Sequence, residues 1–296
     1  MRRAVTRDWR YGHGSVVKSA GGARPDPVVA YDGFVGYVRS RREAGDYLLA
    51  EKLAREGIAA VEVMLGPDAL ELAVLLNELG IIGKYRGNFV EAEELYRRAL
   101  AIHESSGAPA SANVAAILHN LAGLAHARGD ARAAEPIARR GVAIREALDE
   151  VDPPALAADR AALAAILIDV GKLSEARALL DDVLRDYEQG HGPVDHEIGV
   201  ALHNLGSLQY RDGDVAAAER TLGRAATIKR AVLGPQNPDL AITLYNLACC
   251  AQTLGNIGEA ITHVRQAIEV LEAVVAETQP TLLACRTKLE QLLRCQ

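Results

Sequence analysis

The sequence predicts an all-α solenoid, in which antiparallel helix hairpins of one length stack on each other. Three observations lead to this prediction: a glycine recurs every 42 residues, an alanine follows each glycine by five residues, and apolar residues flank the glycine at spacings of three and four. The glycines and alanines are Gly45, Gly87, Gly129, Gly171, Gly213 and Gly255, with Ala50, Ala92, Ala134, Ala176, Ala218 and Ala260. Identical stacked hairpins need such a constant interval, and a domain with a single core does not.

The first helix of each repeat is predicted to end at the recurring glycine. Seven leucine or tyrosine positions share one place in this helix: Tyr37, Leu79, Leu121, Leu163, Leu205, Leu247 and Leu289. A glycine followed by a mostly polar residue suits a left-handed residue that closes a helix in a tight turn. The stretch from Asp32 to Tyr37 is an exception, because its composition makes a poor helix.

The second helix of each repeat carries the recurring alanine, and a linker follows it. A small side chain lets the first helix cross at close range, where a leucine would hold the two axes apart. In the linkers, Asp152-Pro153 and Asn237-Pro238 are typical of an N-cap followed by proline at the first helical position. Asp68 with Glu71 has the form of a capping box.

These signals divide the chain into a tail, an array and a terminal helix. A basic tail, predicted to be disordered, covers 1–29, and a single array of repeats covers 30–296, because a solenoid can grow without enlarging its core. The expected repeats are 31–72, 73–114, 115–156, 157–198, 199–240 and 241–282, with a capping helix at 283–296.

The pattern resembles the tetratricopeptide repeat, in the 42-residue variety of kinesin light chains. The resemblance is clear in Ala201-Leu202-His203-Asn204-Leu205-Gly206, in Gly213-Asp214 with Ala218-Glu219, and in Val232-Leu233-Gly234-Pro235-Gln236-Asn237-Pro238-Asp239. It covers about 31–296 and is strong from 72 to 282. The third full repeat departs from it, with Ala162 in place of the asparagine. The resemblance implies a right-handed superhelix whose first helices line a concave groove.

Carried over from that resemblance, the groove residues come from the first helices. The expected peptide-binding residues are Asn77, Lys84, His119, Asn120, His126, His203, Asn204, Tyr210, Tyr245, Asn246 and Gln252. Asparagine has a donor and an acceptor, so Asn120, Asn204 and Asn246 can match the main chain of an extended peptide whatever its side chains are. Alternatively, these asparagines bond to neighbouring helices and hold the superhelix together.

One repeat interrupts this polar row with apolar residues. An apolar groove floor is expected from Ala158, Ala161, Ala162, Ala165 and Ile168, and it would accept a leucine or aromatic anchor of the ligand. The alternative is simply tighter packing of that helix pair.

Composition and charge narrow the partners. Hydrophobic residues make up 49% of the chain and aromatic residues only 4%, as expected for close-packed helices. Residues 1–44 hold nine Lys and Arg against four acids, a net charge of +5; since the whole chain carries −6, residues 45–296 carry −11. We therefore expect a protein or peptide partner and no nucleic acid. No apolar run long enough for a membrane span and no signal peptide is present, so we expect a cytoplasmic chain and no membrane partner.

No catalytic residue, cofactor or metal site is expected. His119 and His126 lie two turns apart on one helix, and His203 repeats the position of His119 two repeats later, so whole hairpins separate it from the other two. Gly80-Ile81-Ile82-Gly83-Lys84 lacks the strand, the glycine spacing and the hydroxyl residue of a phosphate loop. The four cysteines include the adjacent Cys249 and Cys250 and indicate reduced thiols, not a disulfide framework.

Two function classes follow, with a third left open. The first is a non-catalytic adaptor or scaffold that binds an extended peptide in the groove; the second is an assembly component that forms homo-oligomers or hetero-oligomers through its ends or convex face. In the second case Leu292 and Cys295 would remain available to a partner. A ligand-sensing regulator is the third. The tail, with Trp9 and Tyr11, is interpreted either as a flexible segment or as a segment that occupies the groove until a partner arrives.

Overall fold

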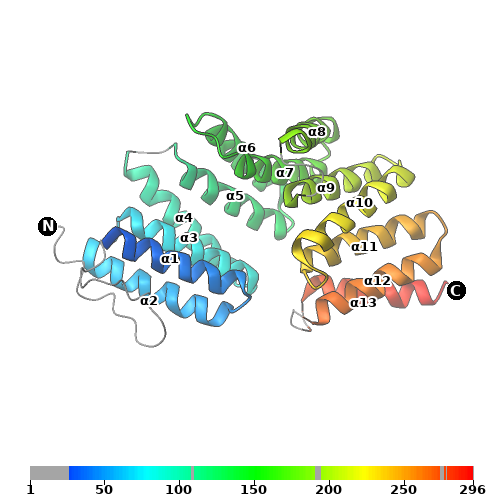
Figure 1. The fold of residues 1–296 in the computed structure, drawn as a ribbon, viewed down its shortest axis with the longest axis horizontal. Coiled ribbons are helices and arrows are strands. Elements are labelled where there is room, and N and C mark those ends of the chain that lie inside the picture. Colours follow the sequence, from blue (N-terminus) through cyan, green and yellow to red (C-terminus); the bar gives the residue numbers. More distant parts are fainter. Residues whose placement is uncertain (1–26, 108–109, 191–194, 274–276, 278, 296) are drawn as a thin grey trace. The chain divides into compact units, whose positions relative to one another are not determined.

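The computed structural model describes residues 27–107, 110–190, 195–273, 277 and 279–295, and over these ranges it contains thirteen α-helices and no strand (Figure 1). The expected tail lies outside the described residues up to position 26. Its last three positions, 27–29, already belong to the first helix, so the tail ends earlier than the sequence predicted.

The helices form two compact units, 1–128 and 129–296, called here the N-terminal and the C-terminal unit. The N-terminal unit contains α1 (Pro27–Glu43), α2 (Tyr47–Leu65), α3 (Leu70–Tyr85), α4 (Phe89–Ser105) and α5 (Ala112–Ala127). The C-terminal unit contains α6 (Ala131–Glu146), α7 (Pro153–Asp169), α8 (Leu173–Gly190), α9 (His196–Arg211), α10 (Val215–Leu233), α11 (Pro238–Thr253), α12 (Ile257–Glu272) and α13 (Pro280–Leu293). The single continuous array expected from 30 to 296 stays a prediction.

Within each unit, helices that follow each other in the chain pack together. In the C-terminal unit α9 packs on α10, α10 on α11, α11 on α12 and α12 on α13 (Figure 1). The first helices of successive repeats also touch: α1 contacts α3, α3 contacts α5, α7 contacts α9, and α9 contacts α11. This is the packing of an all-α solenoid, as the sequence predicted.

The recurring glycines adopt the left-handed conformation that the turn prediction required. Their φ angles lie between 77° and 89°. At one of these turns the N–H of Gly213 donates to the carbonyl of Tyr210 over 3.2 Å, and the N–H of Asp214 donates to that of Gln209 over 3.0 Å. This pair of bonds is the Schellman arrangement that closes a helix. The Asp214 carboxylate then accepts from the N–H of Ala217 over 3.0 Å and caps α10.

The recurring alanines are fully buried, as close helix crossing predicts. All six have 0% exposure. The opposite helix also carries a small residue at the crossing. A Cβ added to Gly206 of α9 would lie only 2.6 Å from Cγ of Leu222 on α10. Small residues on both helices therefore bring their axes together.

Two local predictions about helix starts are wrong. The stretch from Asp32 to Tyr37 is helical within α1, because Phe34, Val35 and Val38 are buried and this packing outweighs the weak helix propensity of its glycines. Asp68 does not cap α3, which begins at Leu70 after Ala69 without a side-chain cap. By contrast, Asp152 and Asn237 cap α7 and α11 as predicted.

The last helix closes the apolar end of the C-terminal unit. Leu282, Cys285 and Leu292 of α13 are 0–1% exposed and join the core of α10, α11 and α12. The expectation that Leu292 stays available to a partner is therefore wrong, whereas Leu283 and Leu293 remain 47% and 45% exposed. Within the described ranges, no helix combines the length and apolarity that crossing a bilayer requires.

Candidate functional site

The predicted site residues lie on the first helices of the repeats, and the rows they form within each unit are called the first-helix faces. In the N-terminal unit this face belongs to α1, α3 and α5. In the C-terminal unit it belongs to α7, α9, α11 and α13. Parallel first helices in contact bring side chains about 42 residues apart next to each other.

On the face of the N-terminal unit, two predicted residues bond to each other. Nδ2 of Asn120 on α5 donates to Oδ1 of Asn77 on α3 over 2.9 Å, and both side chains are half-buried. Lys84 lies nearby, because a Cβ added to Gly123 of α5 would be 3.3 Å from its Nζ. His119 and His126, also predicted, are half-buried on α5.

An ionic cluster between α1 and α3 was not predicted as part of the face. Glu78 is buried, with 2% exposure. Its carboxylate accepts hydrogen bonds from Arg39 over 2.7 Å and from Arg42 over 3.1 Å. Glu78 directly follows Asn77 in the chain, yet its side chain pairs with α1 and links the first two repeats. Sequence reasoning had no signal for this, because nothing in the spacing identifies which arginines face which acid.

On the face of the C-terminal unit, both predicted asparagines bond to the preceding first helix. Nδ2 of Asn204 on α9 donates to the backbone carbonyl of Ala161 on α7 over 2.9 Å. Nδ2 of Asn246 on α11 donates to Oγ of Ser207 on α9 over 3.2 Å. Each side-chain amide thus uses one of its N–H groups for a hydrogen bond between helices, and both side chains are half-buried. The reading that these asparagines bridge neighbouring helices is confirmed for this unit.

His203 belongs to a polar cluster beneath the same face. Its Nδ1 lies 3.0 Å from Oγ1 of Thr243, and that hydroxyl donates to the backbone carbonyl of Asp239 over 3.1 Å. The buried Lys229 of α10 donates to the same carbonyl over 3.4 Å. Because the Thr243 proton is used on Asp239, the His203 Nδ1 carries the hydrogen of the other bond.

The pKa values of this cluster follow from its burial. Burial lowers the pKa of His203 to about 3, and the neighbouring Lys229 charge adds to the effect. Burial also lowers the pKa of Lys229, although Asp239 acts in the opposite direction. His203 is therefore neutral at pH 7 and offers a hydrogen bond, not a charge.

Polar residues at the turn end of the face connect successive helices. Oη of Tyr210 lies 3.1 Å from Oγ1 of Thr253, and Oε1 of Gln252 accepts from Nζ of Lys288 over 2.5 Å. Arg211 donates to the backbone carbonyl of Ile168 over 2.7 Å. Tyr245 is half-buried, and burial raises the pKa of its hydroxyl. Lys288 and Thr253 complete this edge, and the sequence reasoning missed both.

The predicted apolar floor is narrower than expected. Ala161 and Ile168 are 0% and 4% exposed and belong to the core. Ala158, Ala162 and Ala165 are half-buried and remain on the accessible side of α7. Ile168, which was expected to form part of the floor, instead packs in the core.

No group in the described part of the chain brings together three or more His, Cys, Asp or Glu side chains that could hold a metal ion. The described thiols of Cys249, Cys250, Cys285 and Cys295 are free. Burial raises the pKa of Cys250 and Cys285 to about 11, so these thiols are protonated and weakly nucleophilic.

The comparison with known families decides the identity of the repeats. A family model described as the tetratricopeptide repeat matches residues 34–105, 84–147, 155–231 and 197–273, which together make up more than half of the chain. The chain belongs to the tetratricopeptide repeat family. Tetratricopeptide repeat folds generally serve as protein-interaction scaffolds, without a reaction centre of their own.

Solved structures of other proteins share the fold. The repeats of a putative kinesin light chain from Podosopora anserina are 20% identical, with a TM-score of 0.56, and the match covers 68% of this chain and 95% of that one. The quorum sensor NprR from B. thuringiensis is 14% identical in its apo form, with a TM-score of 0.64 and coverage of 90% and 70%. NprR has also been solved in complex with its cognate peptide NprX.

Curated relatives match over a shorter stretch. The clustered mitochondria protein homolog of Coccidioides immitis is 24% identical over 131 residues, which is 42% of this chain and 10% of that protein. The chain thus spans about a tenth of the length of the curated relatives it matches.

Proposed function

We propose that this tetratricopeptide repeat protein is a non-catalytic adaptor that binds an extended segment of a partner protein on its first-helix faces. The observation that carries the proposal is the hydrogen bonding of the Asn204 and Asn246 side chains. Each spends one N–H on the preceding helix, at 2.9 Å and 3.2 Å, and this bond holds the amide plane in one orientation. The second N–H and the carbonyl oxygen of a half-buried amide remain for a ligand.

An orientation fixed before binding lowers the entropic cost of capture. An extended main chain offers a carbonyl and an N–H at regular intervals, so one amide can accept and donate at the same backbone unit. Tyr210 lies on α9 with Asn204 and is 37% exposed, and Tyr245 precedes Asn246 on α11, so both can supply aromatic area to the ligand. The three accessible alanines of α7 leave room for an apolar residue.

The N-terminal unit offers a related set on its own face. Asn120 and Asn77 bond to each other over 2.9 Å, and Lys84 adds a positive charge close to α5. This set favours an acidic side chain or a carboxylate on the bound segment. The complex of NprR with its cognate peptide NprX supports the general proposal by analogy, because a protein of similar fold binds a peptide.

The test uses a peptide selected from a random library displayed on phage, with binding measured by fluorescence polarisation. The Asn204→Ala, Asn246→Ala double variant removes at least one hydrogen bond to the ligand main chain per asparagine, each contributing about 0.5–1.5 kcal/mol, so affinity should fall at least roughly 5-fold to 150-fold. Asn256→Ala is the matched control, because this exposed asparagine lies in a turn and makes no capping bond.

Circular dichroism and urea unfolding show whether the double variant keeps its fold, since it also loses the bonds to Ala161 and Ser207. Unchanged affinity in a folded double variant would contradict peptide binding by these asparagines.

A second candidate is assembly through the C-terminal end. Leu283 and Leu293 of α13 are 47% and 45% exposed, and exposed leucines on a terminal helix suit a contact with another copy or another protein. Light scattering distinguishes the two: a monomer at all working concentrations favours the adaptor, and a dimer that Leu283→Glu dissociates favours assembly.

A further inference from the structure

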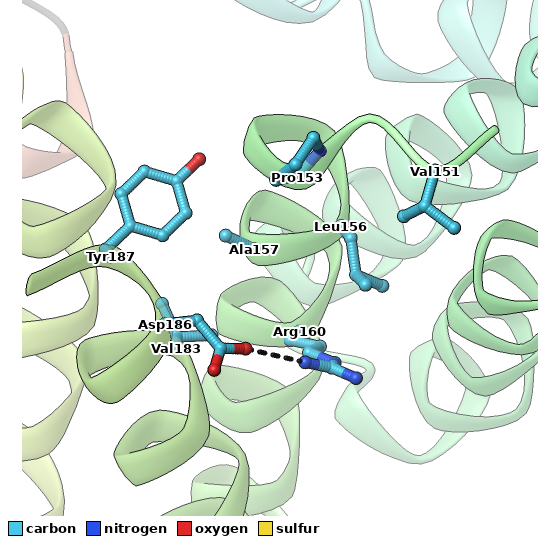
Figure 2. Close-up of a pocket in the computed structure, with 8 residues that line it drawn as sticks. All are labelled: Val151, Pro153, Leu156, Ala157, Arg160, Val183, Asp186 and Tyr187. Atoms are coloured by element: carbon cyan, nitrogen blue, oxygen red, sulfur yellow. Dashed lines mark ion pairs between the residues drawn. The ribbon is translucent and has the colours of Figure 1, made fainter. Parts of the chain in front are cut away.

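A pocket of about 320 Å³ lies in the C-terminal unit between α7 and α8, and none of the residues that line it is a predicted peptide-binding residue. Its apolar wall is formed by Val151, Leu156, Ala157, Val183 and Tyr187 (Figure 2). Val183 and Tyr187 are 1% and 2% exposed and belong to the core of the hairpin, whereas Val151 at the opening is 38% exposed.

The repeat pattern explains why this pocket exists. Fifteen residues after the turn glycine, most repeats carry a branched aliphatic residue: Ile102, Ile144, Ile228 and Val270, with Ala60 in the first repeat. Ile102, Ile228 and Val270 are 4–8% exposed and fill the inside of their hairpins. In the hairpin of α7 and α8 this position is Asp186, whose side chain is 63% exposed.

The next hairpin shows where the missing side chain would lie. Gly199 of α9 occupies the same repeat position as Ala157, fourteen residues before the turn glycine. A Cβ added to Gly199 would lie 3.2 Å from Cγ2 of Ile228. Ile228 therefore packs against the place that corresponds to Ala157, which lines the pocket. The pocket thus includes the place that a branched aliphatic side chain occupies in the neighbouring hairpin.

Charged side chains stand at the rim of the pocket. Arg160 donates to Glu146 over 2.8 Å, and its other terminal nitrogen lies 3.6 Å from the Asp186 carboxylate, the contact drawn in Figure 2. Asp152 caps α7 at the same end. Two carboxylates, those of Glu146 and Asp186, thus lie against one guanidinium, and Asp186 is the less tightly paired of the two. A positive charge on a ligand would be favoured at Asp186.

We propose that this pocket binds a branched aliphatic side chain of a partner protein, presented by a segment that has a lysine or arginine beside it. The partner supplies in trans the side chain that Ile228 supplies within its own hairpin. The loosely paired Asp186 carboxylate selects the flanking lysine or arginine, and the apolar wall selects the aliphatic residue. This site is independent of the first-helix asparagines and does not depend on the proposed function.

The test is a methyl NMR titration of the full chain with short capped peptides. With acetyl-Lys-Ile-Lys-amide, the methyl signals of Val151, Leu156 and Val183 should shift and saturate. Acetyl-Lys-Ala-Lys-amide should bind roughly tenfold more weakly or not at all, because it buries less apolar area. Acetyl-Glu-Ile-Glu-amide should bind several-fold more weakly than the lysine peptide. No saturable shift of these methyls would overturn the proposal.

Three variants sharpen the result. Asp186→Ile should fill the pocket within the chain, abolish the shifts and raise the melting temperature, whereas Asp181→Ile places the same side chain at an exposed position of α8 and should change neither. Asp186→Asn keeps the pocket open and removes the charge, so the preference for isoleucine should survive and the preference for lysine should disappear.

Undiminished shifts in Asp186→Ile would place the peptide elsewhere and contradict the proposal. Binding that is seen only after deletion of residues 1–26 would also overturn it, since the chain's own N-terminal segment would then be the occupant.

Discussion

At the scale of single residues, several polar side chains that lie between helices have a hydrogen-bond partner on another helix. Asn204, Asn246 and His203 each bond to a neighbouring first helix, and Lys229 reaches the backbone carbonyl of Asp239. A buried polar group without a partner costs about 1–3 kcal/mol, so these bonds fix which helix faces which. The same bonds limit what each side chain can still offer to a ligand.

The titration of His203 predicts the acid sensitivity of the fold. Its pKa is about 3 in the folded chain and 6.5 without perturbation. Between these values the unfolded chain binds more protons than the folded chain. The contribution of His203 to the free energy of unfolding is therefore fully present above about pH 6.5 and is lost as the pH falls. Between about pH 7 and about pH 5, the free energy of unfolding of the parent protein should fall by about 1–2 kcal/mol more than that of the His203→Gln variant, as measured by urea unfolding. Equal losses in both proteins would show that His203 does not contribute.

At the scale of helices, close crossings depend on small residues facing each other. Gly206 of α9 and Ala218 of α10 meet within one hairpin: a Cβ added to Gly206 would lie 3.4 Å from the Ala218 carbonyl oxygen. Burial of a larger side chain here would force the helices apart, although the turn glycine and the cap at Asp214 keep their ends fixed.

Ala218→Leu tests this crossing. Overpacking should lower the free energy of unfolding by about 1–3 kcal/mol, because the turn prevents the two axes from separating freely. Ala216→Leu is the control on the same helix, since Ala216 is exposed and leucine favours helix formation. Thermal unfolding measures both, and an Ala218→Leu protein as stable as the parent would argue against the crossing.

At the scale of the whole molecule, each helix pair contacts mainly its neighbours, and the end of the array needs a cover. In the C-terminal unit α13 is this cover, through Leu282, Cys285 and Leu292. Exposed charges also link successive hairpins, for example Arg139 with Glu175 and Arg55 with Glu91, but such surface pairs contribute little individually.

Two adjacent leucines of α13 separate the covering role from a binding role. Leu292→Ala removes a fully buried side chain and should cost about 2–5 kcal/mol, whereas Leu293→Ala should stay within about 0.5 kcal/mol because this residue is 45% exposed. Urea unfolding followed by circular dichroism provides both values. Similar losses for the two variants would mean that α13 does not close the core as described.

Much of the architecture could be predicted from the chain alone. The turn glycines, the buried alanines and the caps at Asp152 and Asn237 are local requirements of a hairpin, and a repeated local requirement is visible as a period. The prediction was wrong at α1, where packing of Phe34 and Val38 outweighed propensity, and at Leu292, where the position on the helix decided burial.

By itself, the sequence determined the family, the length of the repeat and the helices that carry the candidate site, because these depend on residues near each other in the chain. Only the tertiary structure decided that Asn204 bonds to Ala161, that Ile168 is lost to the core and that Asp186 leaves a pocket. Each of these depends on which side chains of different helices meet, and helix spacing and rotation set that, not periodicity.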